Sequence, residues 1–251
     1  MESKVIVSML FGRGGSKGLP GKNIKAILGR KVLEYPLMAC KNSKYVNEIY
    51  CSTDCKNIAA VAESFGAKVV MRPDELCTDE SLIHDAITHC AKLILAKQKV
   101  KYFVITLCNA PNLTTHGIDK AIEMLNEHRE LDSVISVARY DMYAPERART
   151  LSNGSKLILK PYVSFDKFDH KISCDRSSHH PTFFADGGFT VVRSESLIDI
   201  SQNTPPFLWM GKNIGYFEQA PGGGDIDYLW QVPMLEQWLR DAGFTETSTP
   251  Y

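Results

Sequence analysis

Glycines and cations fill one stretch of the chain, residues 12–23, whose sequence is GRGGSKGLPGKN. The apolar residues 5–10 precede it and have the pattern of a buried strand. Glycines let the backbone approach a ligand with its N–H groups pointing inward, and Arg13, Lys17 and Lys22 add positive charge. Arginine can donate paired hydrogen bonds to phosphate oxygens, whereas lysine acts as a mobile point charge. The stretch therefore predicts a phosphate-binding loop.

Two well-known phosphate loops do not match this stretch. The P-loop requires a glycine, four residues and then Gly-Lys-Ser/Thr, but Gly21-Lys22 is followed by Asn23 and no glycine stands at the upstream position. The dinucleotide pattern G-x-G-x-x-G fails because Lys17 occupies its last position. A solvated surface turn is the simpler alternative, and the position directly after a predicted strand argues against it.

A second pattern, Asp225-Ile226-Asp227, places two carboxylates on either side of one apolar residue. Alternate side chains of an extended segment point the same way, so both carboxylates can hold one hard cation. Mg²⁺ prefers one or two carboxylates together with phosphate oxygens and waters. The alternative is a capped helix start, because Asp stabilises a helix N-terminus. A phosphate loop in the same chain favours the metal site.

The elements that must position these residues alternate between short apolar strands and helical patterns. This alternation predicts an α/β fold with a mostly parallel sheet and right-handed crossovers, in which nucleotides bind at the carboxyl ends of the strands. The glycine-rich loop follows such a strand, and so do residues 52–54. The predicted strands are 5–10, 48–53, 68–71, 102–107, 132–137, 183–193 and 213–219. The predicted helices are 33–43, 54–65, 81–97, 115–127 and 228–242, with Asp54 or Thr53, Ser81, and Thr114 or Thr115 as caps.

Length and composition limit what the chain can be. Its 251 residues suffice for one large domain. The chain has 29 Lys and Arg residues and 29 Asp and Glu residues, so it lacks the excess of positive charge that broad binding to nucleic acids or anionic membranes needs. No apolar run is long enough to cross a bilayer, and the N-terminus lacks a signal-peptide pattern. Seven scattered cysteines without a C-x-x-C pair are typical of reduced thiols. We expect a single cytoplasmic domain of residues 1–251.

Residues 13–23 closely resemble the nucleotide-binding signature of the CMP-sugar synthetases, the cytidylyltransferases that make CMP-sialic acid and related CMP-nonulosonates. The resemblance implies a three-layer, Rossmann-like nucleotidyltransferase fold that uses CTP and Mg²⁺. The family's loop usually opens with Pro-Ala, where this chain has Phe11-Gly12. By resemblance, Asp225 and Asp227 bind the metal and, with Arg13 and Lys22, are catalytic. The implied nucleotide contacts come from Arg13, Gly14, Ser16, Lys17, Lys22, Asn23, Arg72 and Ser81.

The acceptor side differs from the family pattern. Residues 107–113 read LCNAPNL, where the sialate enzymes usually carry a glutamine-containing turn and the Kdo enzymes a Gln-Gly-Asp turn. Asn109 here could hydrogen-bond a polyol or could simply form the turn. The region 138–185 corresponds to a small dimerisation subdomain that reaches the partner's active site, so the resemblance implies a homodimer. It also implies that Arg176 meets the acceptor's carboxylate and that Asp186 occupies the family's Asn-Gly-Ala turn beside the acceptor.

One group of residues in the same region has metal-ligand chemistry. Cys174, Asp175, His179 and His180 lie close together in the sequence. Adjacent histidines do not follow a usual zinc-site spacing, however. We therefore expect no metal there.

The residues and the resemblance together predict a CTP-dependent nucleotidyltransferase. The anomeric hydroxyl of a 2-keto sugar acid attacks CTP in line and pyrophosphate leaves, with catalysis by positioning and electrostatics rather than by a side-chain nucleophile. A sialic acid-like nonulosonate is the expected acceptor. A Kdo-type acid, a phosphonate acceptor and a non-catalytic nucleotide-binding paralogue are the alternatives. The predicted partners are CTP, the acidic sugar and a second copy of the chain, with no nucleic acid and no membrane.

Overall fold

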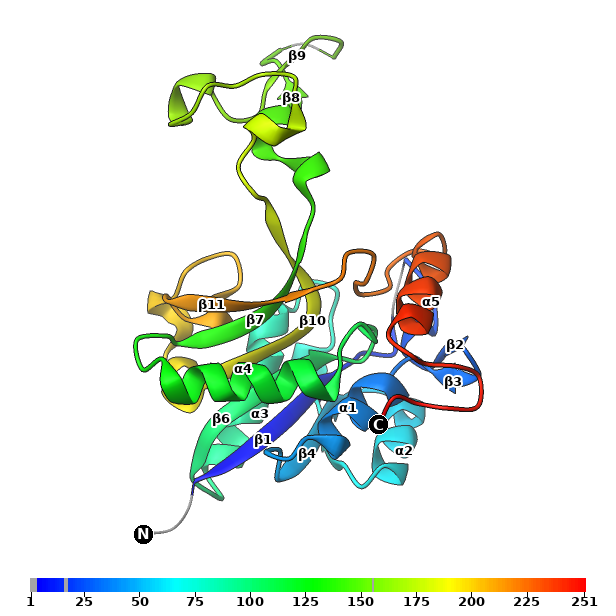
Figure 1. Ribbon diagram of the computed structural model, residues 1–251. Helices are drawn as coiled ribbons and strands as arrows, with labels where there is room; N and C mark the ends of the chain where they lie inside the picture. Colours follow the sequence, from blue (N-terminus) through cyan, green and yellow to red (C-terminus); the bar gives the residue numbers. More distant parts are fainter. Residues whose placement is uncertain (1–3, 16–17, 155) are drawn as a thin grey trace.

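The computed structural model describes residues 4–15, 18–154 and 156–251, and a seven-stranded sheet runs through its centre (Figure 1). The strands are β1 (Val5–Phe11), β4 (Glu48–Thr53), β5 (Lys68–Met71), β6 (Val100–Leu107), β7 (Ser133–Arg139), β10 (Phe183–Arg193) and β11 (Ile214–Gln219). Their order in the sheet is β11-β7-β10-β6-β1-β4-β5. Neighbouring strands pair in parallel except at β10, which runs antiparallel to β6 and β7. The predicted α/β fold with a mostly parallel sheet is confirmed.

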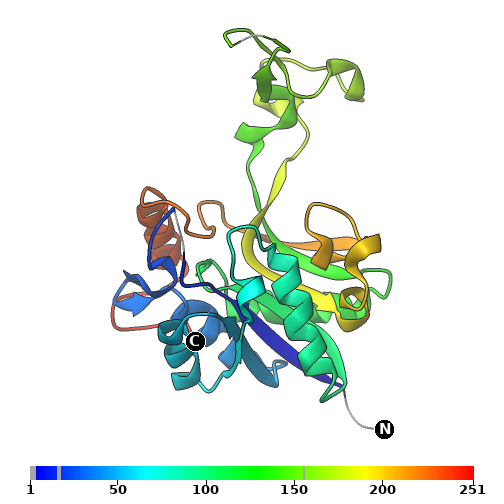
Figure 2. The ribbon, with the colours of Figure 1, turned by 180° about the vertical axis from the view of Figure 1, so that it is seen from behind.

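Helices cover both faces of this sheet, which gives three layers (Figures 1 and 2). The helices α1 (Glu34–Asn42), α2 (Lys56–Ser64) and α4 (Thr115–Glu127) pack on one face, and α3 (Ile83–Leu95) packs on the other. Alternate residues of β1 enter the two cores, with Leu10 under the first group of helices and Met9 under α3. A strand buried on both faces requires the continuous apolar run that the sequence contains.

A third, smaller core lies beside the sheet. It packs α5 (Gln231–Asp241) against the hairpin of β2 (Ala26–Ile27) and β3 (Arg30–Lys31), through buried residues that include Leu235 and Leu239 of the helix and Ile27 of the hairpin. Leu19 of the glycine-rich loop packs against this core, and Ile226, between the two aspartates, is part of it. The two patterns that the sequence suggested are therefore anchored to the same small core.

The side-chain caps predicted for α4 and α2 have different outcomes. Thr114 caps α4 as predicted, because its hydroxyl oxygen accepts the N–H of Gly117 at 3.1 Å. The caps predicted for α2 are wrong, because its N-cap residue is Cys55 and no side chain caps it. Asp54 instead accepts the backbone N–H of Gly14 at 2.8 Å, so its carboxylate holds the glycine-rich loop.

The helices α3 and α5 start later than predicted because nearby side chains close turns. The Ser81 hydroxyl donates to the carbonyl of Glu75 at 2.8 Å and accepts the N–H of Thr78 at 3.2 Å, so Ser81 belongs to a turn before α3 and does not cap it. The side-chain oxygen of Gln231 accepts the N–H of Asp227 at 2.7 Å. The aspartate pair therefore precedes α5 by a turn and does not cap it, which removes the alternative interpretation of that pattern.

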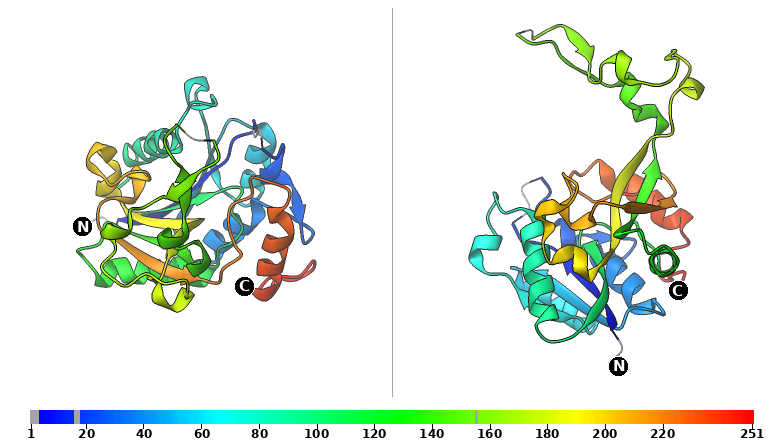
Figure 3. Two further views of the ribbon diagram at one scale, coloured as in Figure 1. Left: turned by 90° about the horizontal axis from the view of Figure 1, so that it is seen from above. Right: turned by 90° about the vertical axis from the view of Figure 1, so that its left-hand side faces the viewer.

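Residues 140–182 form a projection between β7 and β10, which we call the arm (Figures 1 and 3). It contains a two-stranded sheet of β8 (Arg149–Leu151) and β9 (Leu159–Pro161) and several short 3₁₀ turns. Among the described residues of the arm, Ala144 and Glu146 are the buried ones. The arm lies within the excursion predicted at 138–185, and its role in dimerisation stays a prediction.

Two further expectations concern the chain as a whole. Within the described ranges, no helix has the length and apolar character needed to cross a membrane. The seven cysteines are free, and Cys174 is the exposed one among them. The prediction of reduced, mostly buried thiols therefore agrees with the structure.

Candidate active site

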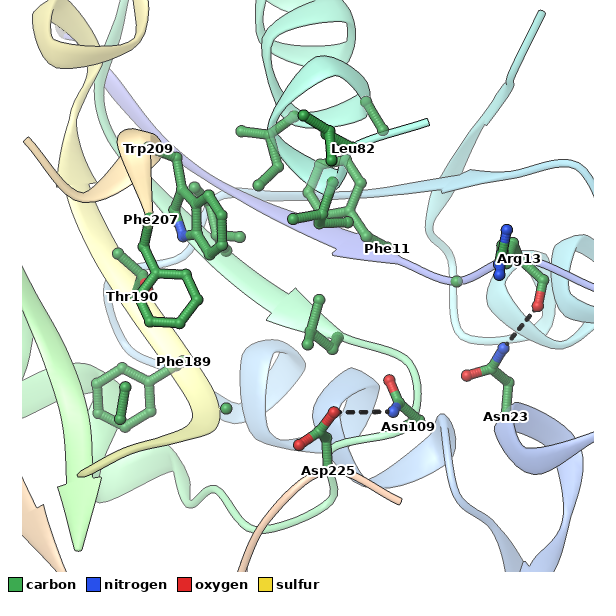
Figure 4. Close-up of a pocket in the computed structure, with 18 of the residues that line it drawn as sticks. Phe11, Arg13, Asn23, Leu82, Asn109, Phe189, Thr190, Phe207, Trp209 and Asp225 are labelled. Atoms are coloured by element: carbon green, nitrogen blue, oxygen red, sulfur yellow. Dashed lines mark hydrogen bonds between the residues drawn. The ribbon is translucent and has the colours of Figure 1, made fainter. Parts of the chain in front are cut away.

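A cavity of about 600 Å³ opens at the carboxyl ends of β1 and β6 (Figure 4). This is the edge at which open α/β sheets bind ligands. One end of the cavity is polar and the other is apolar, as Figure 4 shows with Arg13, Asn23 and Asp225 on one side and Trp209 on the other. The predicted site residues that line it are Arg13, Lys22, Asn23, Arg72, Ser81, Asn109, Asp225 and Asp227.

Close approaches of the backbone explain two glycines of the loop. A Cβ atom on Gly12 would lie 2.7 Å from the Cβ of Cys108, and one on Gly18 would lie 2.7 Å from the carbonyl oxygen of Asp227. Neither distance is compatible with ordinary van der Waals contact. The loop therefore packs directly against the 107–113 turn and against the segment that carries the aspartate pair.

Arg13 of the loop already has polar contacts within the chain. Arg13 Nη1 donates to the carbonyl of Thr78 at 3.0 Å and lies 3.2 Å from an Asp79 carboxylate oxygen. Exposed ion pairs contribute about 0–1 kcal/mol, so an anionic ligand can replace this one at little cost. Asn23 is buried, and its amide donates to the Arg13 carbonyl at 2.9 Å, which holds the loop in place. The predicted loop residues outside the described ranges are Ser16 and Lys17.

The aspartate pair has the arrangement that its spacing predicted. Ile226 is fully buried, whereas Asp225 and Asp227 on either side of it both line the cavity. Lys22 Nζ lies 2.5 Å from Asp227 Oδ1. The Asn109 amide donates to the carbonyl of Ile226 at 3.1 Å and approaches the Asp225 carboxylate at 3.4 Å. Asn109 therefore positions this segment.

The electrostatics of the pair favour a cation. Burial raises the pKa of Asp225, the charge of Asp227 raises it further, and Lys22 opposes the rise. A divalent ion beside the pair would favour the charged form of Asp225. The donor set and its location beside a phosphate-type loop fit Mg²⁺.

Arg72 is buried at the same edge, where it joins two strands. Its Nε donates to the Ser52 hydroxyl at 2.9 Å and its Nη2 to the Ser52 carbonyl at 2.8 Å, and the guanidinium lies over the ring of Phe11. The guanidinium therefore lies in the cavity wall with its orientation fixed. Ser81 also lines the cavity, through the turn described above.

Asp186 lies outside the set of residues that line the cavity. Its carboxylate accepts hydrogen bonds from the Ser136 hydroxyl at 2.5 Å, the Gly188 N–H at 3.0 Å and the Gln219 amide at 2.8 Å. Burial raises the pKa of Asp186, and these hydrogen bonds oppose the rise. The side chain thus shapes the turn that brings Gly187 to the cavity, and its predicted contact with the acceptor stays a prediction.

Arg176 lies on the arm, in the 3₁₀ turn Arg176–Ser178, and its side chain is exposed. It is absent from the lining of this chain's own cavity. A role at an active site would therefore have to be performed in a second copy of the chain. The structure brings the other predicted acceptor residue, Asn109, to the cavity, where its first contact is with the aspartate segment.

The apolar end of the cavity was missed by the sequence analysis. Leu82 comes from the turn before α3, Phe189 from β10, and Phe207 and Trp209 from the connection between β10 and β11 (Figure 4). The only local signal is a pair of aromatic residues in the predicted loop 194–212. Their assembly depends on contacts between segments that are more than 100 residues apart.

Comparisons with known proteins bear on this geometry. Residues 5–157 match the family described as Cytidylyltransferase. An N-acylneuraminate cytidylyltransferase of Oncorhynchus mykiss is 33% identical over 252 residues, which cover 99% of this chain and 54% of that protein. A CMP-N,N'-diacetyllegionaminic acid synthase of Legionella pneumophila is 28% identical over 213 residues, which cover 81% of this chain and 86% of that protein. The chain thus spans about half the length of the first of these relatives.

The solved structures inform the fold. A CMP:2-keto-3-deoxy-manno-octonic acid synthetase complexed with CTP has a TM-score of 0.67 at 16% identity, over 95% of this chain and 99% of that one. At this identity the likeness shows the fold alone. The predicted Rossmann-like fold of the nucleotidyltransferases is confirmed by it.

Proposed function

Because the chain belongs to the cytidylyltransferase family, we propose that it transfers CMP from CTP to a hydroxyl of an acidic sugar and releases pyrophosphate. One observation carries the proposal. The glycine-rich loop, Lys22 and the pair of Asp225 and Asp227 meet at a single cavity, although about 200 residues separate them in the sequence. Phosphate binding and cation binding are the two requirements of nucleotidyl transfer.

We assign the contacts with CTP to the following described residues. The loop offers the Arg13 guanidinium to the phosphates, and Lys22 adds a charge beside the aspartate pair. The side-chain oxygen of Asn23 is buried and accepts no hydrogen bond within the described structure, so a donor group of the nucleotide can satisfy it. Arg72 supplies a cation of fixed orientation in the cavity wall.

Asp225 and Asp227 would hold Mg²⁺. When bound, the ion offsets charge on the phosphate oxygens and lowers the pKa of the attacking hydroxyl. Lys22 keeps the Asp227 carboxylate oriented toward the cavity, and Asn109 fixes the backbone between the two aspartates. These contacts orient the ligands before substrate arrives, which is how such sites gain most of their rate.

The apolar end of the cavity supports an acceptor with an apolar substituent. Phe189, Phe207 and Trp209 form a surface that suits an acyl group better than a plain polyol. An N-acylated nonulosonate carries such a group, whereas a Kdo-type acid does not. The acceptor we propose is therefore an N-acylated, sialic acid-like 2-keto sugar acid.

The arm supports the proposal that the protein is a homodimer. It projects from the body and exposes large apolar side chains, among them Leu151, Leu159 and Tyr162, which are 52%, 61% and 70% exposed (Figure 3). A twofold partner would cover this surface and would receive Arg176 near its own cavity. The Arg176 guanidinium would then meet the acceptor's carboxylate. In this proposal the arm is part of a single domain of residues 1–251.

The first experiment measures pyrophosphate release with Mg²⁺, each of the four NTPs, and a panel of acceptors. The panel holds N-acetylneuraminate, its deaminated analogue, legionaminate, pseudaminate and Kdo. We expect turnover with CTP and an N-acylated acid. Asp225→Asn and Asp227→Asn should abolish it, whereas Asp241→Asn, an exposed carboxylate on α5, is the matched control and should not.

The outcomes separate the alternatives. Turnover with Kdo alone would move the acceptor to the Kdo class. Tight CTP binding without turnover on any acceptor would favour a nucleotide-binding paralogue. A preference for UTP or GTP would overturn the cytidylyltransferase assignment itself.

A second experiment tests the dimer and Arg176 together. Arg176→Ala and Asp227→Asn are each expected to be inactive. When the two variants are mixed and refolded, half of the dimers are mixed, and each carries one intact site, so roughly a quarter of the sites recover in a twofold dimer. No recovery from a mixture that sedimentation shows to be dimeric would place Arg176 outside the partner's site.

A further inference from the structure

The arm lacks a hydrophobic core of its own. None of its described residues belongs to the three buried cores of the body, and Ala144 and Glu146 are its buried residues. Small units without a core usually depend on a disulfide, a metal ion or a partner. The cysteines of the chain are free, and the single one on the arm is Cys174, so a disulfide within the arm is excluded.

Three metal-ligating side chains of the arm converge at one point. Asp169 Oδ1 lies 3.3 Å from His170 Nδ1 and 3.3 Å from His180 Nε2. Each residue offers one donor atom within 4.8 Å of the other two. In a tetrahedral zinc site with bonds of about 2.0–2.1 Å, neighbouring ligand atoms are about 3.3 Å apart. The separations from the carboxylate therefore equal the edge of a zinc tetrahedron.

The two imidazoles lie side by side at the Asp169 carboxylate. The rings of His170 and His180 stack with centroids 4.1 Å apart and an angle of 24° between their planes. Imidazole coordinates a metal through an in-plane lone pair on one ring nitrogen, so one ring must turn out of this stack to bind the same ion as the other.

The buried carboxylate of Glu146 lies next to His170. The Glu146 side chain is 2% exposed, and its Oε1 lies 3.0 Å from His170 Nε2, the nitrogen that faces away from Asp169. Glu146 Oε2 and His170 Nε2 are both buried without a well-formed hydrogen bond. Carboxylates in this position recur behind metal-binding histidines, where they fix the tautomer and orient the ring. The Glu146 carboxylate also accepts the backbone N–H of His180 at 3.4 Å, so it contacts both histidines.

We propose that the arm binds one Zn²⁺ ion through Asp169, His170 and His180, with Glu146 supporting His170 and water in the fourth position. Two imidazoles and a carboxylate suit zinc better than magnesium, so this site is chemically distinct from the aspartate pair in the cavity. The ion joins the start and the end of the segment 169–180, and so staples the loop that carries Arg176. The sequence analysis grouped His180 with Cys174 and Asp175, whereas in the structure His180 contacts Asp169 and His170.

The test uses the full-length protein, stripped with a chelator and titrated with Zn²⁺ against a chromophoric competitor. We expect one equivalent of tightly bound zinc, and a visible absorption band of tetrahedral type when Co²⁺ replaces it. Asp169→Asn and His180→Gln should abolish both signals. The Asp169 side chain is 84% exposed, so its substitution leaves the fold intact. Glu146→Gln should weaken zinc binding about 10- to 100-fold.

Matched controls separate this site from other ligands. Asp166→Asn removes an exposed carboxylate from the same arm, and His128→Gln removes an imidazole from the body, so both should bind zinc as the wild type does. Asp225→Asn should also bind one equivalent of zinc, which distinguishes the site on the arm from the aspartate pair in the cavity. Zinc should slow proteolysis within the arm of the wild type and leave that of Asp169→Asn unchanged. Equal zinc affinity in the wild type and in Asp169→Asn and His180→Gln, or no tight zinc in the wild type, would overturn the proposal.

Discussion

Gly12 permits a close contact between the glycine-rich loop and the 107–113 turn, and its replacement by alanine should disrupt that contact. The added Cβ would lie 2.7 Å from Cys108 Cβ and 2.8 Å from Cys108 Sγ. Gly12 does not have a positive φ, so the effect is steric rather than conformational. Carbon atoms normally approach to about 3.5–4.0 Å, and the end of β1 must therefore move away from the turn by up to about 1 Å.

The expected losses of stability and of kcat/KM depend on which parts of the structure are displaced. Overpacking of this kind costs about 1–3 kcal/mol, and each kcal/mol lowers Tm by about 2–4 °C in a chain of this size. Movement of the turn would also displace the aspartate pair, because Asn109 follows Cys108 and donates a hydrogen bond to the Ile226 carbonyl between the two aspartates. Misplacement of catalytic groups by about 1 Å can cost about 100-fold in rate. We expect Gly12→Ala to lose about 10- to 100-fold in kcat/KM.

The chain offers a control in the same loop. A Cβ atom on Gly15 meets nothing within 4 Å, so Gly15→Ala should change stability by less than about 0.5 kcal/mol and leave kcat/KM near the wild-type value. Cys108→Gly removes both atoms that clash, and the double variant Gly12→Ala/Cys108→Gly should recover at least half of the lost stability. The measurements are thermal unfolding and pyrophosphate release.

Two results would refute this reasoning. If Gly12→Ala and Gly15→Ala behave alike, the contact with Cys108 is not a constraint. If Gly12→Ala is destabilised but Cys108→Gly does not relieve it, the cost arises elsewhere in the loop.

Three further predictions follow from single contacts. In chelator-treated protein, burial and the charge of Asp227 raise the pKa of Asp225, so the Asp225 carboxyl keeps its proton to a higher pH in the folded state than in the unfolded state. The free energy of unfolding should therefore fall as the pH rises from the ordinary carboxyl range through the raised pKa. Asp225→Asn should flatten this part of a curve of Tm against pH. Phe207→Ala should raise KM for an N-acylated acceptor by up to about tenfold with little change in KM for CTP, since about 1.5 kcal/mol of apolar contact is lost. Thr114→Ala should cost about 1 kcal/mol through loss of the α4 cap, seen as a lower Tm, whereas Thr114→Ser keeps the hydroxyl and should not.

Strands could be predicted from the sequence because their signal is local. Residues 48–53 and 68–71 form strands with the predicted bounds, since each is a short apolar run that ends in polar residues. The position of β10 between β6 and β7 could not be predicted, because antiparallel insertion depends on pairing between distant segments. The starts of α2, α3 and α5 were wrong for a similar reason. Asp54, Ser81 and Gln231 form tertiary contacts or turns that the sequence does not reveal.

The site divides in the same way. The glycine-rich loop and the Asp225–Asp227 pair could be singled out from the sequence because each is a compact local pattern, and residues of both line the cavity. Their roles in phosphate and metal binding stay predictions. The apolar end was not, because Leu82, Phe189 and Phe207 come from three separate segments. The cluster on the arm shows the same limit, since His180 meets His170 only after the loop between them has closed.

Two departures from the pattern of the CMP-sugar synthetases meet in the fold. The loop has Phe11-Gly12 in place of Pro-Ala, and the turn 107–113 carries Cys108 near the place of the usual glutamine. The side chain of Cys108 occupies the space that an alanine at position 12 would need. Because the Cβ atom of residue 108 alone lies 2.7 Å from that of an alanine at position 12, the clash would persist with any residue other than glycine at position 108. With this backbone, substitution of residue 108 by glutamine would therefore not make room for the family's alanine at position 12, and the end of β1 or the turn would have to move.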